Sequence, residues 1–121
     1  MAHLELAGET LILRLSFLER LGAAVLGDAQ VPLTAVRSAR ATDAPWGELR
    51  GIRWPGTGLP GKIALGTRRF SGGKDFVAVY GKGPAVIVEL AGVEFSRLVV
   101  SSRDAETIAA EIDAAADAAR R

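Results

Sequence analysis

The chain has 121 residues, no cysteine and a formal net charge of +1. This length fits one domain over residues 1–121, and the absence of cysteine excludes disulfides, thiolate metal sites and thiol catalysis. The nearly neutral charge argues against a nucleic-acid partner. Because there is no apolar run of bilayer length and no basic signal-peptide start, we expect a soluble, cytoplasmic protein without a transmembrane segment.

The N-terminal part of the chain predicts a hairpin followed by a helix. Apolar side chains alternate with other residues through 4–15, and Gly8 and Glu9 stand at the turn, a pattern typical of a β-hairpin. Ser16 stands three residues before Glu19, the spacing of a capping box in which each side chain binds the other residue's backbone N–H. We therefore expect a short helix to begin there.

The middle of the chain is less regular. Residues 31–42 predict one long strand with a bulge or bend, because the alternation slips at Val36. Pro32 argues for a sheet edge or a place early in the strand. Residues 43–61 contain three prolines and five glycines and predict one long connection. This connection leaves room for a short strand around 49–54.

Four apolar runs follow, within residues 62–70, 76–80, 86–90 and 98–101. Small residues between them mark turns, so the runs predict consecutive strands in a meander, which is typical of a barrel or a sandwich.

A C-terminal helix is expected at about 103–119, because Ala and Ile recur there at helical spacing. Ser101 and Ser102 precede it and provide side chains that can accept hydrogen bonds from free N–H groups of the first turn. The acidic residues of this segment predict a solvated helix face. The residues of this face are Glu106, Glu111, Asp113 and Asp117, and Asp104 stands at the helix start.

The order Arg-Leu-Val-Val-Ser-Ser-Arg-Asp-Ala-Glu at 97–106 resembles the strand-to-helix junction of bacterial pleckstrin-homology-like domains. The resemblance is strongest over 84–112 and, as architecture, covers the whole chain. It implies a mainly β, α+β fold, a bent half-barrel of about seven strands closed by a C-terminal α-helix. It also implies a binding module or scaffold, since eukaryotic members bind phosphoinositides, peptides or proteins. The first hairpin departs from the basic pattern of phosphoinositide binders, because Arg14 is its one arginine or lysine.

Residues 56–62 read Gly-Thr-Gly-Leu-Pro-Gly-Lys and match most of a phosphate-binding P-loop. A P-loop needs a following helix, but Ile63 replaces the magnesium-binding Ser or Thr and the next residues alternate like a strand. A small nucleotide-binding enzyme is therefore the least favoured hypothesis. His3 is the single histidine, and the acidic residues are scattered, so we expect no metal site, no cofactor and no enzymatic activity.

The candidate binding residues are aromatic and basic side chains of 43–61 and of the hairpin after it. Arg and Trp are enriched at binding hot spots, and a cation beside an aromatic ring can hold an anionic or peptide ligand. The candidates are Trp46, Arg50, Arg53, Trp54, Lys62, Arg68, Arg69 and Lys74. The alternative is that both tryptophans only anchor the connection to the β-structure and that the charged residues are ordinary exposed turn residues.

These observations favour a non-enzymatic binding or scaffold domain for a protein partner or for self-association. Pro32 indicates an exposed strand edge, to which another chain can add by strand pairing. The alternative is an anionic lipid or phosphate ligand, with peripheral membrane contact. The residues for that function are Arg53, Lys62, Arg68, Arg69 and Lys74.

Overall fold

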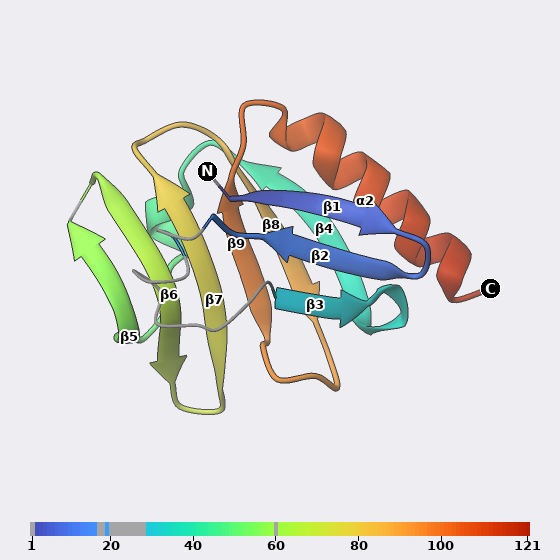
Figure 1. Cartoon of the computed structure of the whole chain (residues 1–121), viewed down its shortest axis with the longest axis horizontal. Helices are drawn as coiled ribbons and strands as arrows, with labels where there is room; N and C mark the ends of the chain where they lie inside the picture. The colour runs from blue at the N-terminus through green and yellow to red at the C-terminus, as the bar shows by residue number, and fades with distance from the viewer. Residues whose placement is uncertain (1, 17–18, 20–28, 60) are drawn as a thin grey trace.

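The computed structural model describes residues 2–16, 19, 29–59 and 61–121, with 29 and 52–57 described by their backbone alone. Its strands, drawn in Figure 1, are β1 (His3–Ala7), β2 (Thr10–Arg14), β3 (Ala29–Pro32), β4 (Val36–Thr42), β5 (Ile52–Leu59), β6 (Ile63–Phe70), β7 (Gly73–Tyr80), β8 (Ala85–Leu90) and β9 (Arg97–Ser101). The helical elements within these ranges are the 3-10 turns η1 (Leu33–Ala35) and η2 (Pro45–Glu48) and the α-helix α2 (Ala105–Ala119).

The described strands form two open sheets rather than one closed barrel. The smaller sheet has the order β1-β2-β3, and the larger has the order β4-β8-β9-β7-β6-β5. Neighbouring strands are antiparallel except β7 and β9, which are parallel. The predicted hairpin is confirmed as β1 and β2, and the mainly β, α+β class with one C-terminal helix is confirmed.

The predicted meander of the last four strands is wrong, although all four strands are present. β9 lies between β7 and β8 in the sheet. The consecutive strands β7 and β8 are therefore not neighbours, and the connection between them spans the position of β9. The residues Val86, Ile87, Val88 and Val99 are all 0% exposed. A strand that is apolar on both faces is most stable in the centre of a covered sheet, and this favours β8 and β9 as central strands.

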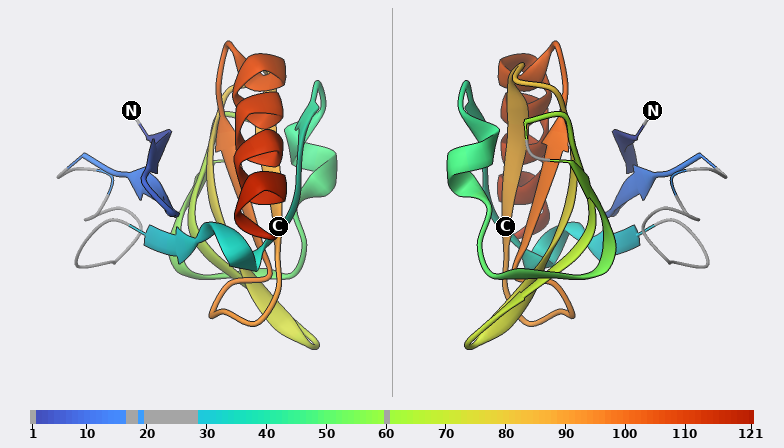
Figure 2. Two further views of the ribbon diagram at one scale, coloured as in Figure 1. Left: turned by 90° about the vertical axis from the view of Figure 1, so that its right-hand side faces the viewer. Right: turned by 90° about the vertical axis from the view of Figure 1, so that its left-hand side faces the viewer.

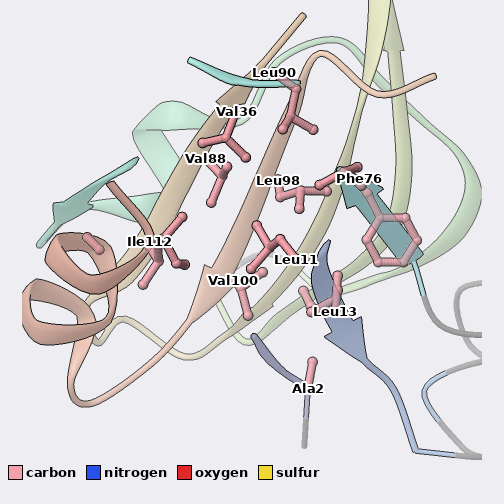
Figure 3. Close-up of a cluster of buried hydrophobic side chains, with 14 of the residues drawn as sticks. Ala2, Leu11, Leu13, Val36, Phe76, Val88, Leu90, Leu98, Val100 and Ile112 are labelled. Carbon is pink, nitrogen blue, oxygen red and sulfur yellow. The ribbon is translucent and has the colours of Figure 1, made fainter. Parts of the chain in front are cut away.

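Each face of the larger sheet carries its own apolar core. Figure 2 shows β1–β3 and η2 on opposite sides of this sheet. We call the face toward β1–β3 and α2 the inner face. Its core unites Leu11 and Leu13 of β2, Phe76 and Leu98 of the sheet, and Ile112 of α2, as Figure 3 shows. The aromatic ring of Phe76 also meets the Phe95 ring edge to face, with 5.5 Å between the centroids.

The outer face packs under η2 and the residue after it. Val77, Val79 and Ile87 are among its buried side chains, and Trp46 and Leu49 cover them. Because both faces are covered, the centre of the larger sheet is the most buried part of the described chain.

Residues 31–42 form strands in two different sheets rather than one long bent strand. β3 pairs with β2 and ends at Pro32 on an edge of the smaller sheet, which agrees with the edge position predicted for this proline. η1 turns the chain, and β4 then pairs with β8 in the larger sheet. The predicted bulge is present in β4, where the register shifts between Val36 and Ser38.

Residues 43–61 are not one long irregular connection, since they contain η2 and β5. Pro45 begins η2, where the fixed φ of proline suits the first turn. β5 overlaps the short strand expected around 49–54 but starts later, at Ile52, and runs on to Leu59. Its pairing with β6 shifts register between Arg53 and Gly56, around Pro55. An edge strand with a bulge tolerates a proline because one side of its backbone needs no partner in the ladder.

The C-terminal helix α2 agrees with the predicted range, starting at Ala105 and ending at Ala119. Ser102 Oγ accepts a hydrogen bond from the Asp104 N–H at 3.3 Å, just before the helix. The helix buries a stripe of small side chains together with Ile112. None of the described helices is both long and apolar enough to cross a membrane.

One residue of the expected solvated helix face, Asp113, has a structural contact instead. Its Oδ1 accepts a hydrogen bond from the Ala39 N–H of β4 at 3.2 Å. Arg120, just after the helix, donates to the Val36 carbonyl at the start of β4. The helix therefore covers free backbone groups along the β4 edge, and its acidic face is only partly solvated.

Glu19 joins the N-terminal strands to the larger sheet. Its Oε1 accepts from the Ser16 N–H at 2.8 Å and its own N–H donates to Ser16 Oγ at 3.2 Å, so the capping box is confirmed. Its Oε2 accepts from the Ala2 N–H at 2.5 Å and from the Tyr80 hydroxyl. Apart from Glu19, the helix predicted here lies outside the described residues. Burial raises the pKa of Glu19, but these hydrogen bonds outweigh it and hold the pKa below its usual value.

We expect Glu19→Gln to destabilise the fold at neutral pH and much less in acid. A carboxyl with a lowered folded-state pKa stabilises the fold above its unfolded pKa of 4.5, and the contribution disappears as the pH falls through the lower folded value. Urea denaturation between about pH 3 and pH 7 measures this for wild type, Glu19→Gln and the exposed-site control Glu111→Gln. A stability difference that stays constant across this range would contradict the assigned role.

Candidate functional site

The candidate Arg50 forms an ion pair on the outer face of the larger sheet. Its Nε and Nη2 donate to the two carboxylate oxygens of Asp75 at 2.8 and 2.7 Å, and its guanidinium lies 4.3 Å from the Phe70 ring centroid. The Asp75 side chain is 1% exposed. This bidentate geometry engages the charge of Arg50 within the fold. Sequence analysis missed Asp75, although an acid directly before the apolar run 76–80 was an available signal.

The candidate Trp46 is half-buried and anchors η2 to the sheet. Its Nε1 donates to the Gly81 carbonyl at 2.7 Å, and its ring packs with Leu49 on the outer core. Trp46 therefore anchors η2 to the sheet, and a binding role for it stays a prediction. Arg53 and Trp54 lie in β5, and their side chains are outside the described parts of the chain.

The candidate Arg68 of β6 forms two hydrogen bonds with the backbone between η2 and β5. Its Nε donates to the Arg50 carbonyl at 3.2 Å, and its Nη2 donates to the Gly51 carbonyl at 3.0 Å. Within the described residues no carboxylate forms an ion pair with this guanidinium. Its position is thus fixed by neutral carbonyl groups, and its charge is not neutralised by them.

Of the remaining basic candidates, Arg69 and Lys74 lie on the β6–β7 hairpin and Lys62 lies at the β5–β6 turn. Lys74 Nζ pairs with Glu94 Oε1 at 2.8 Å. Arg69 is the register partner of Lys74 across β6 and β7, and Lys62 is exposed. The structure therefore does not gather the basic candidates into one patch, and Arg50 and Lys74 are already paired. Binding of anionic lipid stays a prediction.

A network of charged side chains crosses the outer face under η2. Its members are Arg40, Arg50, Arg68 and Arg97 with Glu48, Asp75 and Glu89. Arg40 bonds Glu48 at 2.9 Å, and this hydrogen bond holds the pKa of Glu48 below its usual value. Arg97 pairs with Glu89 at 3.0 Å. We call this group the outer-face network, and it holds one more arginine than carboxylate.

The two edges of the larger sheet differ. At β4, hydrogen bonds from α2 and its end cover the edge at Ala39 and Val36. At the opposite edge, no described strand pairs with the side of β5 that points away from β6. Leu59 of β5 is 58% exposed, the largest value among the described large apolar side chains. An uncovered strand edge is a template for pairing with another chain.

Two shallow pockets flank Trp46. The one that reaches the β5 edge, which we call the edge pocket, has a volume of about 290 Å³ and is lined by Trp46, Leu49, Gly58, Leu59, Ile63, Ala64 and Arg68. The other has a volume of about 380 Å³ and is lined by Asp43, Ala44, Pro45, Trp46, Gly61 and Lys82. Sequence analysis found Trp46, Arg68 and part of the segment but missed the apolar lining, since these residues are far apart in the chain.

The P-loop match at 56–62 lacks its structural context. Gly56–Leu59 lies in β5, Gly61 and Lys62 lie in a turn, and Ile63–Phe70 is a strand where a P-loop requires a helix. Among the described residues, no group of three or more His, Asp or Glu side chains is placed to hold a metal ion.

Comparisons with protein-family models, with curated proteins and with solved structures give no significant match for this chain. The fold defines the class: a mainly β, α+β domain with two sheets and one C-terminal helix, in which the described residues cover the β4 edge of the larger sheet and add no strand to its β5 edge.

Proposed function

We propose that this protein is a non-enzymatic binding or scaffold domain that adds a strand of a protein partner, or of a second copy, to β5. The difference between the two edges of the larger sheet carries the proposal. α2 covers β4, whereas β5 has no strand partner beyond β6 among the described residues and carries the exposed side chain of Leu59. Strand addition at an open edge supplies affinity through the main chain and selectivity through neighbouring pockets.

The proposal includes the finer fold expected from the sequence, a bent half-barrel of the pleckstrin-homology-like type. The strand-rich body and the helix that closes one end of the inner core support it. The parallel pair β7 and β9 differs from a simple meander. Because a fold analogy carries no function, the binding role rests on the β5 edge instead.

We expect Leu59→Lys to abolish association, because a charged side chain on an edge strand blocks edge-to-edge pairing. Leu6→Lys is the matched control, since Leu6 is 38% exposed on β1, an edge strand of the smaller sheet. Light scattering over a concentration series measures self-association, and cross-linking in a lysate of source cells followed by mass spectrometry measures partner capture.

Association by wild type and Leu6→Lys, lost in Leu59→Lys, would support the β5 edge. Identical behaviour of the three proteins, whether all associate or none does, would contradict it. Circular dichroism melting curves establish that each variant is folded.

A further inference from the structure

The edge pocket combines an apolar lining with a single cation. Trp46, Leu49, Leu59 and Ile63 supply apolar surface, and Arg68 supplies a guanidinium. A pocket that is mainly apolar and has one fixed polar group orients a ligand that carries both an apolar group and a polar group. The charge of Arg68 decides which ligand chemistry is complementary.

Arg68 is positioned for an anion that the described fold does not supply. Its Nε and Nη2 donate to the backbone carbonyls of Arg50 and Gly51. Asp75 is its register partner on β7, but both Asp75 oxygens accept from Arg50. The other arginines and the carboxylates of the outer-face network pair with one another, so they leave no carboxylate for Arg68 among the described residues. The remaining N–H groups of a fixed guanidinium favour a carboxylate, which matches their planar geometry.

The floor of the pocket and its size restrict the ligand further. Gly58 of the edge strand and its register partner Ala64 of β6 both line the pocket, so small residues form part of its wall. The volume of about 290 Å³ is at the lower limit for drug-sized ligands and suits one apolar side chain with its carboxylate.

The edge beside the pocket favours a peptide as the source of that carboxylate. Gly56–Leu59 pairs with β6 in continuous register beyond the bulge, and Pro55 lies outside this stretch. Its outward backbone groups are available for an added strand among the described elements. A peptide can thus occupy both the edge and the pocket.

We infer that the edge pocket binds the C-terminal residue of a partner peptide. The apolar terminal side chain enters the pocket, its carboxylate pairs with Arg68, and the preceding residues pair with Gly56–Leu59. This inference rests on the proposed function and names the chemistry of the partner.

The test uses two synthetic peptide mixtures on the immobilised full chain. In both, five randomised positions precede a C-terminal Leu, Ile, Val or Phe; one mixture ends in a free carboxylate and the other in an amide. We expect wild type to retain the free acids about tenfold more than the amides, because a hydrogen bond to a charged group contributes that order of affinity. Mass spectrometry of the retained peptides measures the ratio.

Three variants locate the binding. Arg68→Gln removes the cation, and Gly58→Val fills the pocket at a strand position while leaving Arg68 in place. Arg69→Gln is the control, since adjacent strand residues point to opposite faces. We expect the first two to lose the preference for free acids and the control to keep it, with folding checked by melting curves.

Equal retention of acids and amides by wild type, or no retention of either, would overturn the inference. A preference for free acids that survives in Gly58→Val would also overturn it. The proposed function fails separately, through association that does not depend on Leu59.

Discussion

Arg50→Ala should lower the free energy of unfolding by about 3 kcal/mol, the low end of the range for breaking a buried ion pair. The variant leaves the Asp75 carboxylate, which is 1% exposed, without the two hydrogen bonds that compensate its burial. The low end applies because the Arg50 side chain is itself 37% exposed and is partly hydrated in the wild type. Urea denaturation at neutral pH measures the loss.

Two further variants separate this effect from simple loss of a contact. The double variant Arg50→Ala/Asp75→Ala should be more stable than Arg50→Ala alone, because it removes the buried charge together with its partner. Arg40→Ala should cost less than about 1 kcal/mol, since its side chain is 45% exposed and its pair with Glu48 lies near the surface. A double variant that is less stable than Arg50→Ala would show that the unpaired Asp75 carboxylate is not the cause of the loss.

Gly51→Ala should lower the free energy of unfolding by roughly 4 kcal/mol, through backbone strain and a steric clash together. Gly51 has φ of +73°, and a Cβ built there would lie 2.0 Å from the Arg69 carbonyl oxygen. The clash is with backbone, so relief requires β6 and the start of β5 to move apart. The Gly51 carbonyl is also an acceptor for Arg68, which couples this position to the edge pocket.

Gly8→Ala is the matched control for strain alone. Gly8 has φ of +61° at the β1–β2 turn, and a Cβ there would meet nothing within 4 Å. We expect a loss of about 1 to 2 kcal/mol, the usual cost of a left-handed conformation for a residue other than glycine. Denaturation curves of equal midpoint for the two variants would show that the contact with Arg69 is not tight in solution.

The candidate site was only partly predictable. Composition pointed to Trp46, Arg50 and Arg68, and the structure places all three at or beside η2. Their roles differ, however, because each role depends on a partner from a distant part of the chain. Asp75, which engages Arg50, is 25 residues away from it in sequence, and no local pattern indicates that pairing.

The sequence by itself determined the local elements. The alternation around Gly8 specifies a hairpin, the Ser16 and Glu19 spacing specifies a capping box, and the C-terminal periodicity specifies α2. These features depend on contacts within a few residues, so a short window contains their cause.

Only the tertiary structure decided the order of strands and the open edge. The position of β9 between β7 and β8 follows from the burial of both apolar faces of these strands. The covering of the β4 edge depends on the hydrogen bond from the Ala39 N–H to Asp113. Such pairings join residues that are distant in the chain, and they are selected by the burial of the whole sheet. The same long-range packing placed β5 at the edge of the described sheet and Arg68 beside an apolar pocket.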